Sequence, residues 1–111
     1  KVSDGVMQEI AIVVAPLIRE YAEDADVLKD VLRLSSLLCH SKKGMEVFTS
    51  DLEGLVLAMA VFPESLDVQK WASRVLSKLV ESPSNRETVV EAGGISRLVT
   101  ALRFVGHVEE V

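Results

Sequence analysis

Apolar side chains recur every three to four residues over residues 67–82, which is the spacing of one buried face of an α-helix. They are Val68, Trp71, Ala72, Val75, Leu76, Leu79 and Val80. Asp67 stands where an N-cap is expected, because its side chain can accept a backbone hydrogen bond there. Pro83 is expected to end the helix, since proline disfavours helical backbone at the residue before it. The pattern therefore predicts a long amphipathic helix between Asp67 and Pro83.

Two further helices are predicted after Pro83. The segment 84–87, Ser-Asn-Arg-Glu, matches a capping box and is expected to start a short helix. Gly93 and Gly94 are expected to end it, because glycine adopts the left-handed C-cap conformation without a Cβ clash. The next helix carries one apolar face, formed by Ile95, Leu98, Val99 and Leu102.

The same order of helices recurs along the chain. Segment 27–38 aligns with segment 68–79, an offset of 68 − 27 = 41 residues, and Asp26 takes the N-cap place of Asp67. Segments 14–21, 52–59 and 95–102 align as second helices, and weaker first helices are predicted at 4–12, 42–49 and 84–92. A second capping box is expected at 50–53, and a third long helix at His107, after Gly106. Such a period is the signature of a repeat protein.

This register predicts which side chains are buried. The expected core consists of Leu17, Ile18, Leu34, Leu38, Leu55, Val56, Val75, Leu76, Leu79, Leu98 and Val99. The first repeat is not expected to be polar on its outer side, because Leu28 and Leu32 stand there in place of Gln69 and Ser73. Solenoids need polar caps at both ends, and neither end of this chain looks like one. We therefore expect a piece of a longer array, with self-association through uncapped repeat ends left open.

Several of these features together resemble an armadillo repeat boundary. They are Val68-Gln69, the spacing of Val75, Leu76 and Leu79, Asn85-Arg86, and the run 91–95 with Leu98 and Val99. The resemblance implies an all-α fold, a right-handed superhelical solenoid of armadillo-type repeats. Two full repeats would lie at about residues 4–41 and 42–83, and part of a third at 84–111. HEAT repeats are the alternative, but their units have two helices, and the Gly93-Gly94 break favours three.

The resemblance also implies a non-enzymatic scaffold that binds a partner protein or peptide along the concave face of the third helices. Nuclear-import receptors of the family place a Trp and an Asn four residues apart on that helix. The matching positions here are Arg74 and Lys78, so binding of basic import signals is not expected. One alternative is a chaperone-regulator type of armadillo module that grips a folded partner domain. A nucleic-acid-binding helical repeat is less favoured, because it needs base-stacking side chains at repeat spacing.

Cations stand at the positions that would line the groove: Lys29, Arg33, Lys70, Arg74 and Lys78. Lys29 aligns with Lys70 and Arg33 with Arg74, and four-residue spacing places each series along one helix face. Stacked repeats would set the two rows side by side. The arrangement predicts a basic strip that binds an acidic or phosphorylated segment. The alternative is ordinary solvated surface, neutralised by Asp30 and Glu81.

No motif predicts catalysis, a metal site or a cofactor. Cys39 and His40 are adjacent, and adjacent residues of a helix point about 100° apart. A buried structural cysteine beside a helix-end histidine is therefore expected. His107 is isolated from other metal ligands, and Gly93-Gly94 lacks the pattern of a phosphate-binding loop. Trp71 is expected to pack against a neighbouring helix, with anchoring of a ligand as the alternative.

Composition bears on the compartment and the partners. With 49% hydrophobic residues among 111, the chain can form a packed core and is not expected to be disordered. Its longest apolar run, residues 10–15, is too short to span a bilayer, and no signal-peptide pattern is visible. The single cysteine fits a reducing compartment, so we expect a cytoplasmic or nuclear location. The net charge of −5 argues against nucleic acid as a partner.

Overall fold

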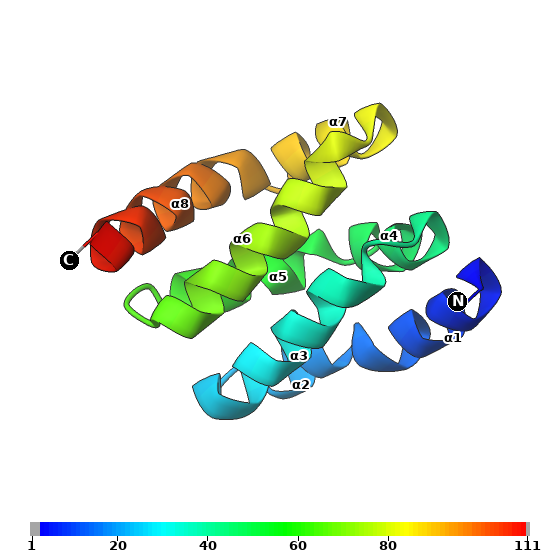
Figure 1. Cartoon of the computed structure of the whole chain (residues 1–111), viewed down its shortest axis with the longest axis horizontal. Coiled ribbons are helices and arrows are strands. Elements are labelled where there is room, and N and C mark those ends of the chain that lie inside the picture. The colour runs from blue at the N-terminus through cyan, green and yellow to red at the C-terminus, as the bar shows by residue number, and fades with distance from the viewer. Residues whose placement is uncertain (1–2, 111) are drawn as a thin grey trace.

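The computed structural model describes residues 3–110, with side chains up to residue 108 (Figure 1). Helices and short loops account for all of these residues, and no β-strand occurs among them, which confirms the predicted all-α class. The helices are α1 (Asp4–Val14), α2 (Leu17–Glu20), α3 (Ala25–Leu38), α4 (Lys42–Thr49), α5 (Leu52–Val61), α6 (Leu66–Glu81), α7 (Pro83–Glu91) and α8 (Gly94–Glu110). None of them is both long and apolar enough to cross a membrane, over the residues described.

The N-caps of the two long helices α3 and α6 lie two residues before the predicted ones. The Asp24 carboxylate accepts from a backbone N–H in the first turn of α3 (3.2 Å), and the Ser65 hydroxyl does the same for α6 (3.3 Å). Asp26 and Asp67 were therefore wrong as caps. They lie in the first helical turn, where a negative charge interacts favourably with the helix dipole. The observed N-caps, Asp24 and Ser65, are again 41 residues apart, since 65 − 24 = 41.

Neither predicted capping box forms. Ser82 has an extended backbone (ψ 121°) and Pro83 is the first residue of α7, which no side chain caps. Pro83 thus ends α6 as predicted, and it also starts α7, where its missing N–H has no cost. In segment 50–53, the Ser50 hydroxyl donates to the Val47 carbonyl oxygen of α4 (2.6 Å) and does not cap α5, and the Asp51 carboxylate accepts two hydrogen bonds from the Arg19 guanidinium (2.6 and 2.8 Å). These hydrogen bonds lower the pKa of Asp51.

The break between α7 and α8 forms at Gly93, as predicted. Its φ of 78° is the left-handed conformation that glycine adopts without strain. The predicted third long helix at His107 is wrong, because α8 continues without interruption through Gly106 and His107. Gly106 has open space around it. One glycine inside a helix costs only about 1 kcal/mol relative to alanine, which does not stop a helix unless the next segment packs elsewhere.

Helices contact one another at a separation of three along the chain. α1 lies against α4, α2 against α5, α3 against α6, and α5 against α8. The helices α3 and α6 run parallel and side by side, as the 41-residue offset predicted (Figure 1). α6 also packs against α8 and α7 on its other side, so it is the central helix of the described chain.

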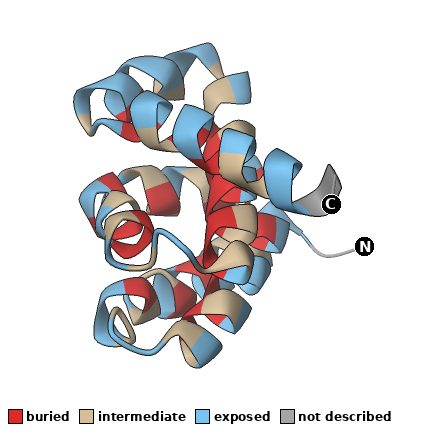
Figure 2. Cartoon of the chain, turned by 90° about the vertical axis from the view of Figure 1, so that its left-hand side faces the viewer, coloured by how far each residue is buried: buried red, intermediate tan, exposed pale blue. Residues whose placement is uncertain are grey.

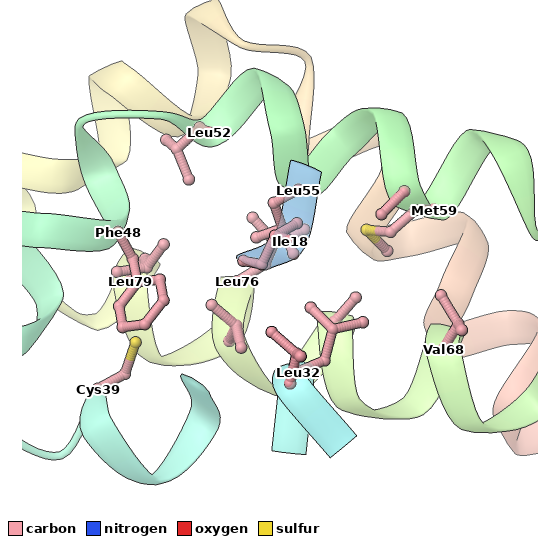
Figure 3. Packing of buried hydrophobic residues seen from close by; sticks show 14 of the residues in the cluster. Ile18, Leu32, Cys39, Phe48, Leu52, Leu55, Met59, Val68, Leu76 and Leu79 are labelled. Carbon is pink, nitrogen blue, oxygen red and sulfur yellow. The ribbon is translucent and has the colours of Figure 1, made fainter. Parts of the chain in front are cut away.

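Buried side chains form one cluster where these helices meet (Figures 2 and 3). The predicted core residues that are buried are Ile18, Leu38, Leu55, Val75, Leu76, Leu79 and Leu98, while Leu17 and Val56 are half-buried. Leu34 and Val99 were placed wrongly, because 40% and 42% of their surface is exposed. On α3, Ser35 and Ser36 face inward instead. Their hydroxyls donate to backbone carbonyls of the same helix (2.7 and 2.6 Å), which makes their burial inexpensive.

The positions that were placed on the outer side of the first repeat are not at the surface. Leu28, Leu32, Gln69 and Ser73 are all buried. The Gln69 amide donates two hydrogen bonds to backbone carbonyls at the end of α5 (2.9 and 2.8 Å). The side chain therefore supplies hydrogen bonds to carbonyl groups that the end of α5 leaves without a partner inside the helix, and it is not a solvent-facing residue.

Candidate binding groove between α3 and α6

A groove lies between α3 and α6, with a volume of ≈ 420 Å³. Its walls are formed by Arg33, Ser36, Leu37 and His40 on one side and by Trp71, Arg74, Ser77, Lys78 and Glu81 on the other. Along each wall every one of these residues lies three or four positions from another of them, so they share one side of the helix. The opposite faces of both helices are turned into the core, which leaves this face open to solvent.

Trp71 organises the cations of the groove. The guanidinium carbon of Arg74 lies 4.8 Å from the centre of its ring, and that of Arg33 lies 5.7 Å away. The Lys70 ammonium is also 5.7 Å from the ring centre. A cation over an indole face is attracted by the ring quadrupole. The ring thus contacts two arginines that come from different helices.

Arg33 and Arg74 have no acidic partner and no hydrogen-bond acceptor among the residues described; their contact is with Trp71. A guanidinium carries five N–H donors, and none of those of Arg33 and Arg74 has a hydrogen-bond acceptor among the described residues. Both side chains are exposed. The groove therefore presents two fixed sets of donors that no group of the described chain satisfies.

Lys78 stands further along α6 and is partly neutralised. Its ammonium lies 3.8 Å from the Glu81 carboxylate, and the two side chains are 36% and 68% exposed. An ion pair with that exposure contributes little, because water screens it. Of the two acids that were expected to neutralise the strip, Glu81 does so in part, and Asp30 pairs with none of the cations within the described residues.

The structure thus brings together four of the five predicted binding residues. Arg33, Lys70 and Arg74 surround one ring, and Lys78 lines the same groove. Lys29 is half-buried and is not among the groove residues. Lys70 makes a further contact besides that with Trp71, so it is not counted as an open cation.

Sequence reasoning underestimated Trp71 and missed Leu37 and His40. Trp71 aligns with Asp30 in the earlier segment, and a repeat comparison therefore gives no hint of a shared role. The available signal was its place between Lys70 and Arg74, which sets an aromatic ring within one turn of two cations. Trp71 also packs partly against the core, as predicted, so it serves both the fold and the groove.

Cys39 and His40 do not form a reactive pair. The Cys39 thiol is buried and points toward Phe48 (Figure 3), and burial raises its pKa to about 12. It therefore stays protonated near neutral pH and is a poor nucleophile. The His40 ring nitrogen Nδ1 lies 3.2 Å from the Ser36 carbonyl oxygen, which fixes the ring at the end of α3. Within the described residues no group of His, Cys, Asp and Glu could hold a metal ion.

Comparisons with known protein families, with curated proteins and with solved structures found no match to this chain. The geometry of the groove is therefore the basis on which a function can be argued.

Proposed function

We propose that this chain is an armadillo-type repeat module that binds an acidic or phosphorylated segment of a partner protein in the α3–α6 groove. The observation that carries the proposal is the convergence of Arg33 and Arg74 on the ring of Trp71. Both guanidiniums keep their donors without an acceptor in the described chain. Carboxylates and phosphates match the planar fork of a guanidinium, and such charge-assisted hydrogen bonds are among the stronger ones in proteins.

The helix contacts support the repeat arrangement. Contacts between helices three places apart are what a stack of three-helix units produces. The residues directly before the first helices of successive repeats recur at the same interval. Ser41 precedes α4 and Ser82 precedes α7, and 82 − 41 = 41. The proposed repeats at residues 4–41, 42–83 and 84–111 have one boundary at Ser41 and the other one residue after Ser82. Arg33 and Arg74 then hold equivalent places in successive repeats.

The charge distribution supports an anionic protein segment over nucleic acid. The chain has a net charge of −5, yet arginine and lysine side chains gather in this groove. A polyanion such as DNA or RNA is bound through many phosphates over an extended basic surface. A short acidic segment needs one local cluster, and long-range attraction then mainly raises the association rate.

The test is a charge reversal in the groove, Arg74→Glu with Lys78→Glu. The probe is a dye-labelled ten-residue peptide that contains four glutamates, and its binding to the full chain is followed by fluorescence anisotropy. We expect the unaltered chain to bind it and the double variant to lose binding, while circular dichroism shows the same helix content. Binding to the unaltered chain should weaken as salt is raised from 50 to 300 mM, because exposed charges are then screened within roughly 6–14 Å.

A matched control is Lys42→Glu with Lys43→Glu. These lysines are exposed on α4 and lie outside the groove, and their reversal changes the net charge by the same amount. The control should bind the peptide nearly as well as the unaltered chain. Equal loss in both double variants would mean that net charge alone governs binding, and it would contradict the proposed groove.

A further inference from the structure

We infer that the groove prefers a phosphorylated serine or threonine over an aspartate or glutamate, with the phosphate held between Arg33 and Arg74. This inference rests on the proposed function, since it names the anion that the same groove would select. The observation behind it is that two guanidiniums, and not one, face the groove without acceptors.

The number of acceptor oxygens decides between the two anions. A carboxylate has two oxygens and one negative charge, and a single guanidinium satisfies it through two parallel hydrogen bonds. The second arginine would then remain without an acceptor. A phosphate monoester offers three terminal oxygens and a charge of about −1.5 to −2 at neutral pH, so it can bind both guanidiniums at once.

Trp71 makes this double contact available before the ligand arrives. Its ring lies 4.8 Å from one guanidinium carbon and 5.7 Å from the other, so both side chains are already held against the same ring. Less side-chain freedom is lost on binding when the donors are held in advance. Trp71 is thus a positioning residue for the two arginines that contact the phosphate.

The remaining walls favour a peptide over a free phosphate or a polyphosphate. The groove is larger than one phosphate needs, and the Leu37 side chain, 55% exposed, lines it one helical turn beyond Arg33. An apolar residue next to the phosphorylated one would cover Leu37 and remove its surface from water. Glu81 at the other end would repel a second phosphate. The best ligand is therefore a phosphoserine or phosphothreonine beside a bulky apolar residue.

The experiment compares three peptides that share one sequence with a leucine next to the variable position, which is serine, aspartate or phosphoserine. Trp71 is the single tryptophan of the chain, so its fluorescence reports binding in the groove directly. We expect the phosphoserine peptide to bind at least about tenfold more tightly than the aspartate peptide, as a second charge-assisted contact predicts. The serine peptide should bind weakest.

The Arg33→Lys and Arg74→Lys variants separate donor geometry from charge. Lysine keeps the charge but loses the planar fork, so each variant should reduce the ratio of phosphoserine to aspartate affinity while the aspartate affinity changes little. Their binding is followed by anisotropy as well. Trp71→Phe should keep part of the preference, because a smaller ring can still contact both cations. Lys43→Arg, outside the groove, should leave the ratio unchanged.

The outcomes distinguish the inference from the proposed function. Equal affinity for the phosphoserine and aspartate peptides would overturn the inference and leave the acidic groove standing. Binding of neither peptide would overturn both. Competition by inorganic phosphate at the same concentration as the phosphopeptide would contradict a peptide ligand, and an unchanged ratio in both lysine variants would contradict the double arginine contact.

Discussion

At the scale of single residues, the junction between α3 and α4 depends on a glycine. A Cβ atom at Gly44 would overlap the backbone carbonyl of Leu38, and that carbonyl cannot move without disturbing the end of α3. Gly106 differs, because a Cβ there would meet no other atom within 4 Å. The two glycines thus offer the same substitution in a closed and in an open environment.

Gly44→Ala should lower the free energy of unfolding by about 1–3 kcal/mol, the usual range for forcing extra volume into a packed site. Gly106→Ala should raise it by about 0.5–1 kcal/mol, since alanine favours a helix over glycine. Urea unfolding followed by circular dichroism measures both. If Gly44→Ala were as stable as Gly106→Ala, the close approach of α3 and α4 would be wrong.

The Cys39 thiol should be almost inert in the folded protein. With a pKa of about 12, its thiolate fraction at pH 8 is on the order of 10³-fold below that of an exposed cysteine with a pKa near 8.5. Alkylation by iodoacetamide should therefore be slow in buffer and fast in strong denaturant. Since Cys39 is the one cysteine, mass spectrometry of the alkylated chain reports it alone. Rapid labelling of the folded chain would contradict its burial.

The same raised pKa has a consequence for stability. Above pH 8.5 the thiol ionises in the unfolded chain, while it stays neutral in the folded one up to about pH 12. The unfolded state therefore binds fewer protons in this window, and the contribution of Cys39 to stability decreases as pH rises. Cys39→Ala should make the loss of stability between pH 8.5 and 10 less steep, which urea unfolding at several pH values would show.

At the scale of helices, the packing of α6 decides which substitutions matter. Leu76 is fully buried on this helix, between elements that lie on both of its sides. Leu34 belongs to the neighbouring helix α3 and was predicted to be buried, yet 40% of its surface is exposed. The pair therefore tests the rotation of the two long helices about their axes.

Leu76→Ala should lower the free energy of unfolding by about 2–5 kcal/mol, from lost burial together with the cavity that remains. Leu34→Ala should change it by no more than about 0.5 kcal/mol, as surface substitutions usually do. Both are measured by urea unfolding. Similar losses for the two variants would show that Leu34 faces the core and that the helix rotation described here is wrong.

The last helix shows how a neighbour decides burial. Leu52 and Met59 are buried on α5, whereas the aligned residues of α8, Ile95 and Leu102, are 39% and 50% exposed. α5 has a later helix, α8, against it, whereas α8 is the last helix described and packs against α5, α6 and α7, which all precede it. Identical apolar spacing therefore leads to a buried face on one helix and an exposed face on the other.

At the scale of the whole molecule, parallel packing of α3 and α6 turns two separate rows of charge into one groove. Arg33 and Arg74 are 41 residues apart in the chain, yet they contact the same ring. Exposed apolar side chains gather on the first and last helices, among them Val13 on α1 and Leu102 on α8. Association through these two faces stays a prediction.

The sequence alone determined most of the helices, their order and the 41-residue offset between the two long ones, but not the uninterrupted course of α8. Helix formation follows from local spacing, from proline and from glycine, and these act within a few residues; the end of α6 before Pro83 and the left-handed Gly93 were both predictable. The parallel course of α3 and α6 followed from the 41-residue offset. Four of the five predicted cations lie together at the groove or at the Trp71 ring, because their spacing placed them on one helix face.

Only the tertiary structure decided the rotation of each helix and the partners of its polar groups. The sequence could not show that Ser35 and Ser36 face inward in place of Leu34, since their hydroxyls are satisfied within the helix. Nor could it show that Trp71 contacts Arg33 of the neighbouring helix. The two residues do not align in the repeat comparison, and they meet only when α3 packs against α6. Burial and ring contacts depend on which surfaces come together in space, and local sequence spacing does not contain that information.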